Sequence, residues 1–377
     1  MSEKNKKSKK RPWLWVIGGI LLFIGMWQFF ANFYREEEKA LLRQLRETIK
    51  ENFPEQHAKF FQTFGLFPFE ADRNISSEVT QTRKTAVLIH GLDDPGKVWQ
   101  NLAPALVKEN VDVWLMHYPN DQPIVESTQL FFDELKRLKP LGIQRISIVA
   151  HSMGGLVSRE MLTSPEIDYR RSVRRGQVPE VATLIMVGTP NHGSQMARFR
   201  IFAEIRDHLN RLTKGEGAWL GAIFDGAGEA KIDLLPGSRF LAELNTRPHP
   251  EGVHQLIIAG ITSPWNDRDI NRWIDKLRKK MSVDRQKQID ALGSYMISMT
   301  HGLGDGLVAV ESTRLEGVPH QTVDGTHLSM IRNITKGSRR IPPAVPIIVN
   351  RLKKEEWTGQ KDFQIDVKAV TDRKSAV

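Results

Sequence analysis

The chain has 377 residues, and its hydrophobic fraction of 40% is enough for a sizeable core, which excludes an intrinsically disordered protein. The absence of cysteine excludes disulfide frameworks, iron–sulfur ligation, thiolate zinc sites and a cysteine nucleophile. Lys and Arg number 54 against 44 Asp and Glu, and the net charge of +10 could indicate nucleic-acid binding, so its position along the chain matters.

Half of that charge lies at the N-terminus. Residues 1–11 contain six basic residues and one acidic residue, and residues 12–34 contain no charged residue. A helix of 23 residues is about 34 Å long, enough to cross a bilayer core of about 30 Å. By the positive-inside rule, the sequence predicts a basic cytoplasmic tail at 1–11, a transmembrane signal anchor at 12–34 and an exported remainder, periplasmic if the protein is bacterial. We therefore expect membrane lipids, and no nucleic acid, as partners.

A cleaved signal peptide is the alternative interpretation of this segment. Its apolar core would be about 7–15 residues long and would end at an A-x-A-like site. The uncharged run is longer than that, and FFANFY at its end offers no such site. The mean hydropathy of −0.36 argues against a protein with several membrane spans.

Residues 35–82 are expected to form a helical spacer. Leucine and isoleucine side chains at 41, 42, 45 and 49 recur near the helical period among many charges. Packing of this helix on the main domain is favoured, and a membrane-surface helix or a dimerising helix is the alternative. Five phenylalanines between residues 60 and 69 are expected to pack in a core, with an exposed patch near lipid as the alternative.

Residues 83–350 show the pattern of an α/β domain. Apolar, β-branched runs alternate with helix-like stretches at 98–108 and 127–139. Such a pattern predicts a mostly parallel sheet covered by helices on both faces, with ligands beyond the carboxyl ends of the strands. The expected strands are TAVLIH (85–90), VDVWLMHY (111–118), RISIVAHS (145–152), ATLIMVGT (182–189), QLIIAGIT (255–262) and HQTVDG (320–325). Residues 351–377 are expected to be a polar tail.

Two long stretches interrupt this alternation. Residues 164–180 include four arginines, Arg170, Arg171, Arg174 and Arg175, which we interpret as a solvated basic loop, with contact to anionic head groups as the alternative. Residues 196–250 include a Gly-rich segment and are expected to form a lid-like insertion.

A candidate nucleophile lies in the segment AHSMGG (150–155). This segment follows an apolar strand and precedes the helix-compatible run LVSREMLT, which favours a sharp strand–turn–helix element that exposes Ser152. The G-x-S-x-G pattern is met except that Ala150 replaces the first glycine. A helix N-cap serine is the alternative role.

A serine hydroxyl needs a base, and the order Ser, acid, His predicts both partners downstream. His327 follows the last expected strand and is our candidate base. Asp305, in a Gly-rich loop, is our candidate acid, which would hold the imidazole in the required tautomer. We rank them above the other late histidines and carboxylates, namely His301, His320, Asp267, Asp269 and Asp324.

The oxyanion of the tetrahedral intermediate needs backbone donors. One expected donor is the amide of Met153, directly after the nucleophile. The second is the amide of Leu92, because the strand TAVLIH ends at a turn containing Gly91.

Several of these motifs together resemble the α/β-hydrolase superfamily, and within it bacterial lipases and esterases and PGAP1-like (GPI-inositol-deacylase-like) proteins. The motifs are LIHGL (88–92), AHSMGG (150–155), GTPNHGS (188–194), LLPGSRFLAELN (234–245), GDGLV (304–308) and the late His327. The resemblance covers residues 83–350 and implies the α/β-hydrolase fold, a serine triad and a lid. It also implies a structural or pocket-lining role for GTPNHGS.

The sequence thus predicts a membrane-anchored serine ester hydrolase acting on hydrophobic or acyl-lipid esters. An acyltransferase with the same residues and a non-catalytic interaction protein are the alternatives. No cofactor is expected, and no metal motif is present, although a structural calcium ion is left open. The sequence does not determine the oligomeric state.

Overall fold

The computed structural model divides the chain into two units, residues 1–52 and 53–377. It describes residues 64–69, 84–92, 96–119, 122–194, 229–262, 267–279, 304–335 and 337–354, with a few positions between 286 and 302. The predicted basic tail (1–11) and transmembrane anchor (12–34) lie outside the described residues. Within the described part, no helix is long and apolar enough to cross a membrane.

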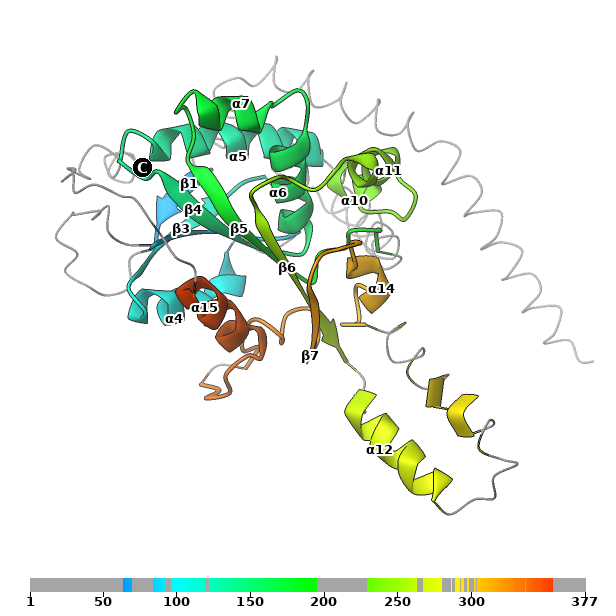
Figure 1. Ribbon diagram of the computed structural model, residues 1–377. Coiled ribbons are helices and arrows are strands. Elements are labelled where there is room, and N and C mark those ends of the chain that lie inside the picture. Colours follow the sequence, from blue (N-terminus) through cyan, green and yellow to red (C-terminus); the bar gives the residue numbers. More distant parts are fainter. Residues whose placement is uncertain are drawn as a thin grey trace, which may run out of the picture. The chain divides into compact units, whose positions relative to one another are not determined.

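A seven-stranded, mostly parallel sheet forms the centre of the second unit (Figure 1). The strand order is β1-β3-β2-β4-β5-β6-β7, and only β1 is antiparallel to its neighbour. The strands are β1 (Gly65–Pro68), β2 (Lys84–Ile89), β3 (Val111–His117), β4 (Arg145–His151), β5 (Glu180–Val187), β6 (His254–Ile261) and β7 (His320–Asp324). All six strands expected from the sequence are therefore confirmed, with ends shifted by at most two residues.

Helices cover both faces of this sheet, as predicted (Figure 1). Helices α5 (Ile124–Leu138) and α6 (Met153–Thr163) pack on one face, and α4 (Leu102–Lys108) and α15 (Ala344–Lys354) on the other. The shorter elements are the 3₁₀ turn η1 (Lys97–Trp99) and helices α7 (Tyr169–Arg174), α10 (Glu229–Asp233), α11 (Arg239–Thr246), α12 (Asp267–Arg278) and α14 (Val310–Thr313).

The central strands are apolar throughout because they are buried on both sides. In β4, Ile146 and Ile148 belong to the core cluster under α5 and α6, whereas Val149 belongs to the cluster under α4 and α15. Successive side chains of a strand point to opposite faces, so both faces of β4 require apolar residues.

Strand β1 corrects the expectation of a helical spacer over residues 35–82. Residues 65–68 of that segment pair with β3 in antiparallel register, Leu66 opposite Met116. The strand has only four residues and includes Gly65 and Pro68, so it lacks the alternating pattern by which strands are recognised. A proline is tolerated there because β1 is an edge strand.

The predicted lid-like insertion at 196–250 is described only in its second part. There, α10 and α11 pack against the domain: Phe240, Leu241 and Leu244 are buried in the same core cluster as α6. Residues 229–246 thus contribute apolar side chains to the core, and the first part of the predicted insertion lies outside the described residues. At the other end of the domain, α15 continues to Lys354, four residues past the predicted boundary at 350.

The carboxylate of Glu134 attaches β1 to α5. Its Oε2 accepts the Leu66 amide hydrogen bond at 2.9 Å and contacts Arg137 Nη1 at 2.5 Å. Because Glu134 is buried, the amide of Leu66 would lose its partner, and not merely exchange it for water, if this carboxylate were removed.

We predict that Glu134→Ala lowers the free energy of unfolding by about 1–3 kcal/mol, the usual cost of an unpaired buried donor. Urea denaturation of the full chain measures the change. Asp133→Ala is the matched control, since Asp133 forms an exposed pair with Lys136 on the same helix and its loss should cost about 0.5 kcal/mol or less. Equal effects of the two substitutions would contradict the role given to Glu134.

Candidate active site

Ser152 occupies a strained turn between β4 and α6. Its φ of 54° and ψ of −127° lie in a region that serine rarely adopts, and such strain persists only where the surroundings impose it. The Ser152 amide donates to the Val187 carbonyl of β5 at 2.8 Å, which holds the turn at the carboxyl end of the sheet. Ser152 as a whole is 8% exposed.

Glycines around this turn allow the backbone to pass close to Ser152. A Cβ atom at Gly91 would lie 2.5 Å from the Cβ of Ser152, and one at Gly154 would lie 2.5 Å from the carbonyl oxygen of His90. Both distances are too short for any side chain. The Tyr118 hydroxyl donates to the same His90 carbonyl at 2.6 Å, and this fixes the chain entering Gly91.

Asp305 and His327 form a hydrogen-bonded pair. His327 Nδ1 lies 2.7 Å from Asp305 Oδ2, and the other oxygen, Oδ1, accepts the amides of Leu307 at 2.9 Å and Val308 at 2.8 Å. The His327 amide also donates to the Asp305 carbonyl at 2.9 Å. Because a carboxylate only accepts, Nδ1 carries the proton of the neutral imidazole and Nε2 is the acceptor.

Two further glycines make room for this pair at the ends of neighbouring strands. Gly188 follows β5 with φ +60°, and a Cβ atom there would lie 3.1 Å from both Asp305 Oδ2 and His327 Nδ1. Gly260, in β6, would place a Cβ atom 2.8 Å from the Cβ of Asp305. Asp305 is 2% and His327 7% exposed, so the pair is almost fully buried.

His151 joins the two parts of the site. It directly precedes Ser152, and its ring lies 4.6 Å from the ring of His327, centroid to centroid. The nucleophile candidate and the base candidate therefore lie at the same end of the sheet. Within the described residues, the Ser152 hydroxyl and the His327 imidazole are not hydrogen-bonded, as is common in sites without substrate, where such contacts tighten on binding.

The two candidate oxyanion donors flank Ser152. Met153 is the first residue of α6, where the helix dipole places partial positive charge. Leu92 directly follows Gly91, which contacts Ser152, and its side chain packs against the core. Both residues thus lie next to the candidate nucleophile.

Four of the five rival residues lie in described helices or strands, with Asp269 inside α12. Asp267 begins α12, as a helix-start residue should, and Asp324 is exposed at the end of β7. His320 begins β7, and its Nε2 contacts the Thr313 hydroxyl at 2.8 Å. His301 lies outside the described residues.

The GTPNHGS segment provides a buried polar network that the sequence did not reveal. The Asn191 side chain accepts from Arg159 Nη1 at 3.0 Å and donates to the Thr313 carbonyl at 2.7 Å. Arg159 Nη2 also donates to Asn245 Oδ1 at 3.0 Å. Burial lowers the pKa of Arg159 to about 10. The segment thus ties α6, α11 and α14 together, which agrees with its interpretation as structural.

A buried ion pair extends this network. Arg247 Nη1 donates to Glu160 Oε2 at 2.7 Å, and Glu160 is almost fully buried. Burial raises the pKa of Glu160, while the neighbouring Arg247 guanidinium opposes that rise. No sequence pattern connects these residues, because their contacts join positions that are 87 residues apart.

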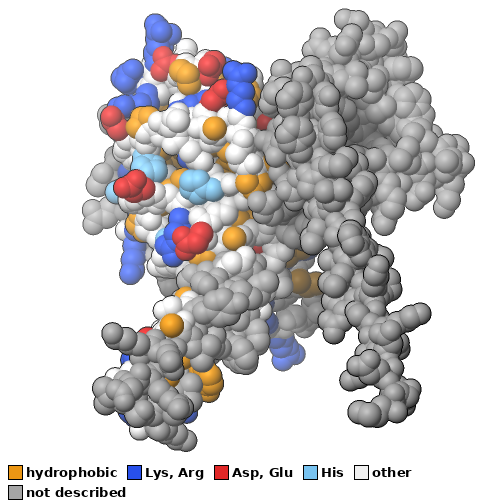
Figure 2. Space-filling model, turned by 90° about the vertical axis from the view of Figure 1, so that its right-hand side faces the viewer, with side chains coloured by type: hydrophobic (Ala, Val, Ile, Leu, Met, Phe, Trp, Pro, Cys, Tyr) orange, Lys and Arg blue, Asp and Glu red, His pale blue; other side chains and the backbone are white. Residues whose placement is uncertain are grey.

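The four arginines of the basic segment lie on or next to α7. Arg170 pairs with Glu251 at 2.5 Å, and both side chains are exposed. Helix α7 lies near the top of Figure 1, and at the same height in Figure 2 basic side chains gather with acidic ones among them. Because α6 runs back from Ser152 before α7 begins, this cluster is at the amino ends of the strands, far from Ser152.

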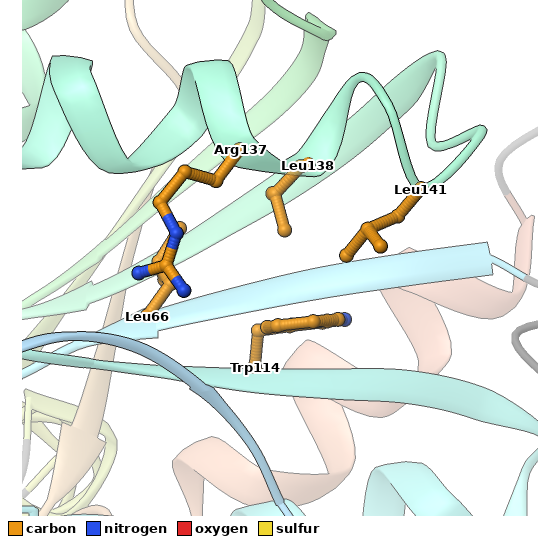
Figure 3. A pocket seen from close by; sticks show the side chains of 5 residues that line it. All are labelled: Leu66, Trp114, Arg137, Leu138 and Leu141. Atoms are coloured by element: carbon orange, nitrogen blue, oxygen red, sulfur yellow. The ribbon is translucent and has the colours of Figure 1, made fainter. Parts of the chain in front are cut away.

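A small apolar cavity of about 30 Å³ lies under the edge strand β1, lined by Leu66, Trp114, Arg137, Leu138 and Leu141 (Figure 3). Leu138 and Leu141 precede the start of β4, whereas Ser152 follows its end. The cavity is therefore separate from the candidate site.

Among the residues that the structure describes, no group of three or more His, Asp or Glu side chains could hold a metal ion.

Residues 124–219 match the family model described as "PGAP1-like alpha/beta domain". No curated protein sequence matches the chain.

Solved structures similar to this chain include three bacterial or metagenomic enzymes. Bacillus licheniformis lipase BlEst2 in its mature form is 16% identical, with a TM-score of 0.46, over 76% of this chain and 97% of that one. Staphylococcus hyicus lipase is 14% identical, with a TM-score of 0.47, over 75% and 99%. The metagenomic carboxyl esterase MGS0156 is 18% identical, with a TM-score of 0.47, over 76% and 80%.

The family match and the sheet topology agree with the motif pattern. The match spans β4, the Ser152 turn and β5 of the mostly parallel sheet, with the helices α5 and α6 that pack on it. Residues 124–219 therefore match a PGAP1-like α/β domain, and the sheet that contains them is seven-stranded, mostly parallel and α/β-hydrolase-like.

Proposed function

We propose that the protein is a serine ester hydrolase of the lipase and esterase type, with Ser152 as nucleophile, His327 as base and Asp305 as the acid that orients the base. One observation carries the proposal. A strained serine at a strand–helix turn shares one end of the sheet with a buried, hydrogen-bonded His–Asp pair. A packed histidine at that position would not need a carboxylate whose second oxygen is held by two backbone amides.

In the proposed first step, the Ser152 hydroxyl attacks the ester carbonyl while its proton passes to His327 Nε2. Asp305 stabilises the imidazolium that forms and keeps Nδ1 protonated. The amides of Met153 and Leu92 donate to the oxyanion of the tetrahedral intermediate. The proton on Nε2 then passes to the leaving alcohol, and an acyl-enzyme remains.

In the second step, water attacks the acyl-enzyme and His327 takes its proton. Collapse of the second intermediate returns that proton to the Ser152 oxygen and releases the carboxylic acid. An alcohol in place of water would give acyl transfer, so product analysis with an added alcohol acceptor distinguishes the two reactions.

The substrate class and location extend this proposal. An uncharged run at 12–34 after a basic tail supports a single-pass anchor with a cytoplasmic N-terminus and an exported domain. An enzyme held at a bilayer meets acyl lipids and other hydrophobic esters first. We therefore propose esters of this class as substrates.

We predict that a fluorophosphonate probe labels the wild-type chain and does not label Ser152→Ala, because the probe reacts only with an activated serine. Gel fluorescence of the purified proteins measures the labelling. Ser158→Ala is the matched control: Ser158 is buried in the same helix, α6, and its hydroxyl only donates to the Gly154 carbonyl. An unlabelled wild type, or a labelled Ser152→Ala, would refute the nucleophile assignment.

We predict that Asp305→Asn lowers kcat for ester hydrolysis by about 10³–10⁴-fold, because an amide facing Nδ1 favours the tautomer that cannot accept the serine proton. The amides of Leu307 and Val308 would keep an oxygen acceptor, so stability should change little. Steady-state kinetics on esters of increasing acyl length measure the effect and the acyl-length preference together. Asp324→Asn, at an exposed rival position, should behave as the wild type.

We predict that the full chain sediments with membranes and resists alkaline extraction, whereas a version beginning at residue 35 does not. Fractionation of expressing cells measures the difference. A third version with the basic residues of 1–11 replaced by Ser should still sediment but lose its fixed orientation, which protease accessibility reports. A full chain in the soluble fraction would contradict the anchor.

A further inference from the structure

His151 is a buried titratable residue that the proposed mechanism does not use. It is 2% exposed, and its Nε2 lies 2.9 Å from the backbone carbonyl oxygen of His327, a residue 176 positions away. Its ring also lies against the His327 ring. A side chain from the residue before the nucleophile thus contacts the backbone of the candidate base.

The protonation state of His151 follows from these contacts. A carbonyl oxygen only accepts, so Nε2 must carry a proton and donate it. The other nitrogen, Nδ1, is buried and has no hydrogen-bond partner among the described residues. A second proton there would be a buried, unpaired donor beside His327, which is unfavourable. His151 is therefore neutral.

The electrostatic surroundings favour the same state. Burial, followed by the neighbouring His327, lowers the pKa of His151 well below its ordinary value; the hydrogen bond to the His327 carbonyl opposes this shift, while His90 and Arg332 add to it. His151 thus stays uncharged when His327 becomes an imidazolium during catalysis, and it adds no repulsion to that step.

The contact completes a set that fixes His327 at both ends of its backbone. The His327 amide donates to the Asp305 carbonyl at 2.9 Å, and its Nδ1 is bound by Asp305 Oδ2. These two hydrogen bonds connect the candidate base only to the candidate acid. The hydrogen bond from His151 connects the candidate base to strand β4, which leads into Ser152.

We propose that His151 is a positioning residue that sets the distance between the Ser152 hydroxyl and His327 Nε2, an inference that rests on the proposed function. His151 ends strand β4 and Ser152 follows it directly. The hydrogen bond from His151 therefore holds the segment that carries the candidate base at a set distance from Ser152. A displacement of about 1 Å between reacting groups can cost about a hundredfold in rate.

Two amide substitutions separate this role from general packing. In His151→Gln, the side-chain nitrogen can take the place of Nε2 and still donate to the His327 carbonyl. In His151→Asn, the nitrogen takes the place of Nδ1 and cannot reach that carbonyl. The two variants are matched in polarity and differ in where the donor lies.

We expect His151→Gln to keep kcat within about threefold of the wild type, and His151→Asn to lose about 10–100-fold in kcat with KM nearly unchanged. Steady-state ester hydrolysis by the full chain measures both constants, and the rate of fluorophosphonate labelling of Ser152 should fall in parallel with kcat. Thermal melting of each variant records its stability.

The outcomes are distinguishable. Equal kcat for the Gln and Asn variants, or losses of kcat that follow melting temperature in both, would overturn the positioning role while leaving the proposed function intact. If His151→Asn does not fold, His151→Met, which fills similar volume without a donor, replaces it, and full activity of that variant overturns the inference. A wild type without esterase activity or labelling would overturn the proposed function, and this inference with it.

Discussion

The backbone of Ser152 is the constraint around which the candidate site is built. A non-glycine residue at such φ and ψ values costs of order 1–3 kcal/mol, and the cost must be offset by its surroundings. The hydrogen bond from the Ser152 amide to the Val187 carbonyl, the close passage of Gly91 and the start of α6 all act on this one residue. As a result, the Ser152 hydroxyl lies at the end of the sheet and makes no capping hydrogen bond to helix α6. The glycines near it are therefore required by space, not by chain flexibility.

The topology brings the other candidate residues to the same edge of the sheet. Asp305 and His327 come from the regions that follow β6 and β7, and these two strands are parallel neighbours at one side of β5. Parallel strands end at the same edge of a sheet, so residues that are 175 positions apart in sequence, such as Ser152 and His327, meet there. Gly188 and Gly260 leave the space in which the candidate acid and the candidate base contact one another.

Much of this arrangement could be predicted because it depends on backbone patterns. Continuous apolar runs identified the six main strands, since their two faces are both buried. The position of Ser152 at a turn followed from the small residues around it. β1 could not be predicted, because four residues with a glycine and a proline carry no periodic signal. Nor could the burial of α11 be predicted. The spacing of its apolar residues suits a helix that packs on a core as well as a helix that covers a pocket.

Side-chain contacts between segments that are distant in the sequence could not be predicted from it. Nothing in AHSMGG distinguishes a histidine that is merely buried from one that binds the backbone of His327. The network of Arg159, Asn191 and Asn245 likewise depends on rotamers and on three elements meeting. Roles that follow from residue type and order could be proposed in advance, whereas roles that follow from a hydrogen-bond partner could not.

The placement of the arginines on α7 separates surface charge from chemistry. α6 has 11 residues, and a helix of that length spans about 16 Å. The side chains of Arg170 and its partner Glu251 are both exposed, so solvent ions screen this charge over about 8 Å at physiological ionic strength. The length of α6 and the acidic partner together weaken the effect of the cluster on the candidate site. Substitutions of these arginines should therefore change the surface charge more than the surroundings of Ser152.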